Sequence, residues 1–111
     1  MTIKVFIPLY GEEVAPRFDL ATEVLLGEYS KEGQIINEKV LLLPGPSAER
    51  LCQMILSESV KVVICGGIEQ EFYDYLSWKH ISVIDNIIGT GHAAFARLVS
   101  GQLNAGDILG A

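Results

Sequence analysis

The stretch "VKVVICGGIEQEF", residues 60–72, decides the fold. Its first part, 60–65, is a nearly continuous apolar run, which is typical of a strand buried on both faces of a sheet. Two glycines follow, and the next apolar residues recur at helical spacing, which predicts a helix over about 68–79. The same stretch raises the functional question, because Cys65 stands where the strand ends.

The segments on either side complete an alternating pattern of strands and helices. The glycine in "KEG" has the position of a hairpin turn between two β-rich segments. Ser47 is placed to cap a helix, and Gly101 is placed to end the last helix. The predicted strands are 3–9, where Pro8 falls at the expected end, 22–30, 34–43, 60–65 and 80–84. The predicted helices are 48–58, 68–79 and one in "HAAFARLVS"; 10–21 reads as a loop.

This order predicts an α/β fold in three layers, with a five-stranded mixed sheet and helices on both faces. We expect residues 1–111 to form one domain, since the chain is long enough for a single buried core.

Composition excludes several classes of protein. The 14 acidic and 8 basic side chains give a net charge of -6, which argues against nucleic-acid binding. The start "MTIKVFIPL" lacks the features of a signal peptide, and no apolar run has the length of a membrane span. Two cysteines are too few for a disulfide framework. We therefore expect a soluble cytoplasmic protein with free thiols.

Ligands of open α/β sheets bind beyond the carboxyl ends of parallel strands. If the first, fourth and fifth predicted strands are parallel, three loops meet at that edge: 10–21, 65–68 and 85–92. The polar and reactive content of these loops is Tyr10, Glu12, Glu13, Arg17, Asp19, Cys65, Asp85, Asn86, Thr90 and His92.

Cys65 and the two glycines after it have two interpretations. Gly66 and Gly67 would permit an anion or cluster to approach backbone N–H groups, or would simply make a tight turn. The neighbouring helix start favours a Cys65 thiolate, whereas free cysteine is also commonly a small buried residue. Cys52 lies on the apolar stripe of its helix and is expected in the core.

His92 falls in the first turn of the last helix, whose positive end disfavours imidazolium. It is either a neutral donor or metal ligand, or a surface or capping histidine near Phe95. A structural zinc site lacks the four ligands it needs, and the "GxSxG" of hydrolases is missing.

Three segments carry a family resemblance: "VFIPLYGEEVAPRFDLATEVLLGEY", "VKVVICGGIEQEFYDYLSWKHISVI" and "GTGHAAFARLVSGQL". Over about residues 3–103 the chain resembles the dinitrogenase iron–molybdenum cofactor biosynthesis family. The resemblance implies a ribonuclease H-like fold with sheet order 3-2-1-4-5. It also implies a role, related to nitrogen fixation, in binding, carrying or assembling metal–sulfur clusters.

The chain departs from many members of this family, although another group of members resembles its "P-R-F-D" and has "I-C-G-x-I" after the fourth strand, as here. Many members read "S-x-H-F-G" in the first loop, where this chain has "A-P-R-F-D". Arg17 therefore stands at the histidine position and Asp19 at the glycine position. Arg17 would either balance the charge of an anionic cluster or pair with Asp19. Additional cysteines, which some members carry after the fifth strand and near the C-terminus, are missing.

Three functions compete. The leading one is a non-enzymatic carrier or chaperone for an iron–molybdenum or other iron–sulfur cluster, which would work with cluster-assembly proteins. Its site would hold Cys65 and His92 as metal ligands, with Gly66, Gly67 and Arg17 around the cluster. The alternative is a protein–protein interaction module of the same fold that has lost cluster binding. The third is an enzyme with a Cys65 nucleophile and a His92 base. The oligomeric state stays open.

Overall fold

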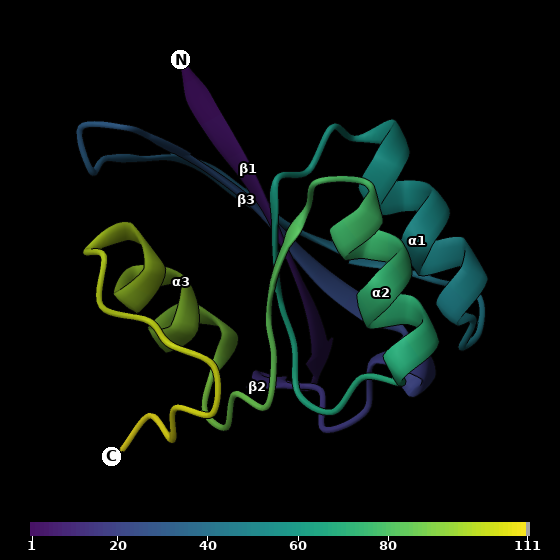
Figure 1. Ribbon diagram of the computed structural model, residues 1–111. Helices are drawn as coiled ribbons and strands as arrows, with labels where there is room; N and C mark the ends of the chain where they lie inside the picture. The colour runs from purple at the N-terminus through teal and green to yellow at the C-terminus, as the bar shows by residue number, and fades with distance from the viewer. Residues whose placement is uncertain (111) are drawn as a thin grey trace.

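The computed structural model describes residues 1–110, which form a mixed sheet with helices on both of its faces (Figure 1). The strands are β1 Thr2–Tyr10, β2 Glu13–Val14, β3 Glu23–Ser30, β4 Ile35–Leu42, β5 Val62–Ile64 and β6 Ser82–Ile84. The helices are α1 Ala48–Ser57, α2 Gln70–Trp78 and α3 Gly91–Val99, and a 3₁₀ turn, η1, spans Phe18–Leu20.

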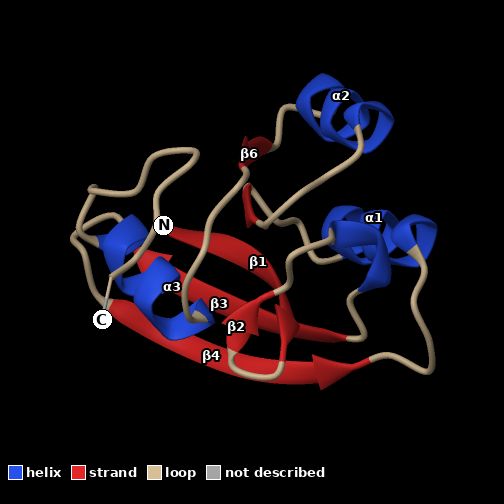
Figure 2. Cartoon of the chain, turned by 90° about the horizontal axis from the view of Figure 1, so that it is seen from below, coloured by secondary structure: helices blue, strands red, loops and turns tan. Residues whose placement is uncertain are grey.

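The sheet has the strand order β4-β3-β1-β5-β6, and β2 pairs with β1 outside this path. The pairs β1–β3 and β3–β4 are antiparallel, while β1–β5 and β5–β6 are parallel. The expected order 3-2-1-4-5 with five strands therefore needs correction. The unpredicted strand β2 makes the sheet six-stranded and raises the number of every later strand by one. Figure 2 shows the long strands β1, β3 and β4 side by side.

Alternation along the strands divides the buried side chains between two cores. Phe6 of β1 and Val63 of β5 join the core beneath α1 and α2. Ile7 and Ile64, their neighbours in the chain, join the core beneath α3. Successive side chains of a strand point to opposite faces, so β1 and β5 each contribute to both cores. Figure 1 shows α1 and α2 on one side of the strands and α3 on the other.

Polar side chains cap the N-terminal ends of α1 and α3. The Ser47 hydroxyl accepts a hydrogen bond from the Arg50 N–H at 3.2 Å, and the Thr90 hydroxyl accepts one from the Ala93 N–H at 3.1 Å. Gly101 has φ of 76° just beyond α3, a backbone conformation that glycine adopts at little cost. Within residues 1–110, none of the helices is long and apolar enough to cross a membrane.

The expectation of a loop over 10–21 is wrong in part. This segment contains β2 and η1, and backbone bonds fix it to the rest of the fold. The expected end of the first strand at Pro8 is also wrong, because β1 continues to Tyr10. The β1–β5 ladder reaches only Phe6, so proline interrupts no pairing on that side.

Candidate functional site

The three loops meet at the carboxyl edge of the parallel strands, as the sequence predicts. The Val14 N–H donates to the Gly89 carbonyl at 2.8 Å, which joins the first and third loops. The Phe18 N–H donates to the Gly67 carbonyl at 2.8 Å, which joins the first and second. The Asn86 N–H donates to the Gly66 carbonyl at 3.0 Å and closes the set. Backbone hydrogen bonds therefore hold all three loops together.

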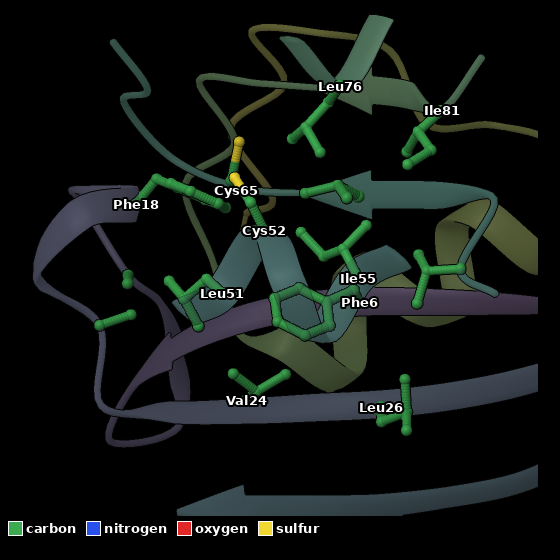
Figure 3. Packing of buried hydrophobic residues seen from close by; sticks show 14 residues of the cluster. Phe6, Phe18, Val24, Leu26, Leu51, Cys52, Ile55, Cys65, Leu76 and Ile81 are labelled. Atoms are coloured by element: carbon green, nitrogen blue, oxygen red, sulfur yellow. The ribbon is translucent and has the colours of Figure 1, made fainter. Parts of the chain in front are cut away.

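Cys65 lies at this edge with its side chain turned inward. It has no exposed surface, and it packs in the core beneath α1 and α2 (Figure 3). Burial raises the pKa of the Cys65 thiol to about 12, and nearby Asp85 adds to the rise. Of the two interpretations of Cys65, the burial and the raised pKa agree with the small buried residue. Cys52 is buried in the same core, as expected.

Gly66 and Gly67 make a turn that the first loop covers. A Cβ on Gly66 would overlap the Ala15 carbonyl oxygen and lie 2.9 Å from that of Pro16. The Gly67 N–H already donates to the Pro16 carbonyl at 2.7 Å. Glycine is thus required here by the close approach of two chain segments. Helix α2 begins only at Gln70, three residues later.

Arg17 is paired with Asp19. Its Nε lies 3.1 Å from Asp19 Oδ1 and its terminal nitrogen 2.6 Å from Oδ2, a two-point ion pair. The Asp19 carboxylate raises the pKa of the Arg17 guanidinium through this hydrogen bond and its charge. Of the two roles expected for Arg17, the geometry shows the pairing with Asp19.

His92 lies on the other side of the sheet from Cys65. It belongs to α3, and its Nδ1 lies 2.9 Å from Glu38 Oε1 of the edge strand β4. Its side chain is 70% exposed, in keeping with the surface interpretation. The structure therefore does not bring Cys65 and His92 together. A nucleophile–base pair of these two residues lacks the hydrogen-bond contact that such chemistry requires.

The described part of the chain offers no ready-made metal-ligand set. Within residues 1–110, no three histidine, cysteine, aspartate or glutamate side chains are grouped so that they could hold a metal ion. A cluster bound at this edge would therefore need Cys65 to turn outward or ligands from another molecule.

The outer surface of the edge is apolar. A pocket of about 270 Å³ lies between Tyr10, Pro16 and Leu20, and a second of about 290 Å³ lies between Pro16 and Ile88. Ile88 pairs in turn with Ile108 of the C-terminal segment. Four of these side chains are exposed by half or more, up to 76% for Tyr10. We call Tyr10, Pro16, Leu20, Ile88 and Ile108 the edge patch.

This patch was hidden in the sequence because its members come from three separate segments. The C-terminal segment had no predicted role, yet backbone hydrogen bonds attach it to the loop after β6. The Ile88 N–H donates to the Asp107 carbonyl at 3.1 Å, and the Leu109 N–H donates to the Ile88 carbonyl at 2.8 Å. A local signal was the apolar pair Ile108–Leu109, which directly follows Asp107.

Solved structures of other proteins share this fold. The crystal structure of PH0822 is similar with a TM-score of 0.83, over 93% of this chain and 94% of that chain, at 20% identity. A provisionally assigned dinitrogenase of Methanocaldococcus jannaschii gives a TM-score of 0.73 over 94% of each chain at 20% identity. A provisionally assigned NifB protein of Thermotoga, placed in the DUF35 family, gives 0.69 over 93% of this chain and 92% of that chain at 21% identity.

No family model matches the sequence, and no curated protein matches it. At identities of 20–21%, the likeness to the solved structures shows the fold of the chain and leaves its activity to be argued from the site.

Proposed function

We propose that this protein is a non-catalytic interaction module of the ribonuclease H-like fold, and that it serves metal–sulfur cofactor assembly by binding a partner protein through the edge patch. The observation that carries the proposal is the contrast at the carboxyl edge. Cys65 has no exposed surface there, whereas Tyr10 is 76% exposed and Ile108 is 72% exposed.

The edge patch has the character of a protein-binding surface. Protein-binding surfaces are commonly marked by a group of large, solvent-exposed apolar side chains with polar residues around it. The two pockets on either side of Pro16 offer space for apolar side chains of a partner. Tyr10 adds a rigid aromatic side chain, a residue type that contributes strongly to protein interfaces.

The link to cofactor assembly rests on the fold. Proteins provisionally assigned as a dinitrogenase and as NifB share it over more than nine tenths of this chain. The resemblance in sequence points to the same class of protein.

A pull-down with variants tests this function. The tagged chain, produced in its native cells, should retain a stable partner that mass spectrometry identifies. Replacing Tyr10 and Ile88 together by serine should release the partner, while Cys65→Ser should retain it. The matched control is the pair Ile36→Ser and Val40→Ser, exposed apolar residues of β4. A partner lost with Cys65→Ser, or lost equally with the control, would refute the proposal.

Cluster carriage is the second candidate, with the metal–sulfur cluster as cargo. It is favoured by the position of Cys65, whose backbone lies at the edge where ligands of such sheets bind. The segment of Ala15 and Phe18, which packs in the same core as Cys65, would have to move before the thiol could reach a cluster. His92 could contribute only to a separate site, because it lies across the sheet. Gly66, Gly67 and Arg17 would need to leave their present partners.

Anaerobic reconstitution distinguishes the candidates. Iron, molybdate and sulfide are added to the wild type and to Cys65→Ser, and the absorption spectrum is recorded. A charge-transfer band that the variant loses would favour cluster carriage. The interaction module predicts the same featureless spectrum for both.

A further inference from the structure

The helices α1 and α2 lie on the face of the sheet opposite α3 (Figure 1). Side chains of the two helices line a groove. The groove has a volume of about 370 Å³. It is lined by residues from the first two turns of each helix: Glu49, Cys52, Gln53, Glu71, Phe72 and Tyr75. None of them belongs to the edge patch, so a role for the groove is independent of the proposed function.

The floor of the groove is apolar and continues along both helices. Leu56 lies one turn beyond Cys52 on α1, and it is 38% exposed. On α2, Tyr75 is followed by Trp78, which is 72% exposed, and the Lys79 Nζ lies 4.8 Å from the centre of the Trp78 ring. From Phe72 to Trp78 this stripe is about 9 Å long at the usual helical rise. It would fit about two turns of a docked helix.

The rim of the groove carries unpaired negative charge. Glu49 and Glu71 are exposed, one on each helix. Within residues 1–110, the acidic partners in ion pairs are Glu58, Asp19 and Glu38, so neither rim carboxylate is neutralised by a side chain. Burial raises the pKa of the Cys52 thiol, and the charge of Glu49 adds to the rise, so Glu49 lies close enough to act on the groove floor.

We propose that the groove binds an amphipathic helix of a partner protein whose apolar face is flanked by lysine or arginine. Apolar side chains spaced by three and four residues would cover Cys52, Phe72 and Tyr75, and flanking cations would pair with Glu49 and Glu71. The two carboxylates repel acidic segments and anionic membrane surfaces, and the net charge of -6 steers cationic partners toward the chain.

A synthetic peptide tests the proposal. The probe is a peptide of about 15 residues with leucine on one helical face and lysine elsewhere, long enough to form a helix when bound. Trp78 is the single tryptophan of the chain, so its fluorescence reports binding to a peptide without tryptophan. We expect saturable binding and NMR amide shifts in α1 and α2.

Charge variants make the test specific. Glu49→Gln with Glu71→Gln should weaken peptide binding about tenfold, because two ion pairs are lost. The control, Glu13→Gln with Glu32→Gln, changes the net charge equally at distant exposed positions and should leave binding unchanged.

Three results would overturn the proposal. The control could weaken binding as much as the groove variant, or amide shifts could fall outside α1 and α2. A self-association of the free protein that the peptide disrupts would show that a second copy occupies the groove instead.

Discussion

At the scale of single residues, the chemistry of the carboxyl edge depends on which way Cys65 faces. Strand alternation determines this, because Val63 and Cys65 point to the same side of the sheet and Ile64 to the other. The apolar run and the strand end were legible in the sequence. The direction of the thiol was not, because both faces of this strand are buried and its continuous apolar run does not distinguish them.

The buried thiol should resist modification in the folded protein. Cys65 has no exposed surface and Cys52 is 6% exposed, and burial raises the pKa of both thiols. Near neutral pH, a thiol reagent should label neither cysteine quickly, and both once a denaturant is added. Mass spectrometry of the labelled peptides measures this. Rapid labelling of Cys65 in the native protein would show that its loop opens.

Stability should fall in alkaline solution partly because of Cys65. Its pKa in the folded chain is about 12, raised from an ordinary value of 9.0, so the unfolded chain releases the proton first. The stabilisation is complete below about pH 9 and is lost progressively as the pH rises toward about 12. From about pH 8 to about pH 10 the loss is about 1 kcal/mol.

Urea unfolding of the wild type and Cys65→Ala at the two pH values checks this prediction. Cys65→Ala should lose less stability than the wild type between the two pH values, because it has no thiol proton to release at residue 65. The packing cost of the substitution is the same at both pH values, so it does not affect this difference. Equal slopes would contradict a raised thiol pKa.

Gly66 should be intolerant of a side chain. Gly66→Ala would overlap the Ala15 carbonyl and should lower the free energy of unfolding by about 1–3 kcal/mol. Gly45→Ala is the control, since open space surrounds that position, and it should change stability by less than about 0.5 kcal/mol. Thermal or urea unfolding measures both, and equal stability of the two variants would show that the turn can relax.

At the scale of elements, η1 fixes the first loop to the core. Phe18 is fully buried, and its ring centre lies 6.2 Å from that of Phe72 on α2. The hairpin, the three helices, the Ser47 cap and the Gly101 helix end followed from local patterns in the sequence. Strand β2 and turn η1 did not, because they are two and three residues long and form through pairing with distant segments.

Removing the Phe18 ring should loosen this loop. Phe18→Ala should cost about 3–5 kcal/mol of stability, the usual range for a buried phenylalanine. Leu20→Ala, in the same turn but 54% exposed, should cost less than about 0.5 kcal/mol. Urea unfolding checks both values. If Phe18→Ala were as mild as Leu20→Ala, the loop would not be anchored through its aromatic ring.

At the scale of the whole molecule, topology decides which residues can share a site. The sheet order brings the three loops to one edge, so their convergence could be predicted once parallel strands were assumed. The same topology separates Cys65 from His92, since α2 and α3 cover opposite faces. The sequence pattern indicated both residues as ligands because it carried no information about the face on which each would lie. The edge patch could not be predicted from the sequence, because its residues come from distant segments that only the fold brings together.

The proposed function is that of an interaction module whose Cys65 thiol stays buried. Its sharpest test is the absorption spectrum after anaerobic reconstitution, recorded for the wild type and for Cys65→Ser. A module that binds through the edge patch and keeps its thiol buried predicts no charge-transfer absorption in either protein. A band that appears in the wild type and disappears in Cys65→Ser would contradict this function and make Cys65 a cluster ligand.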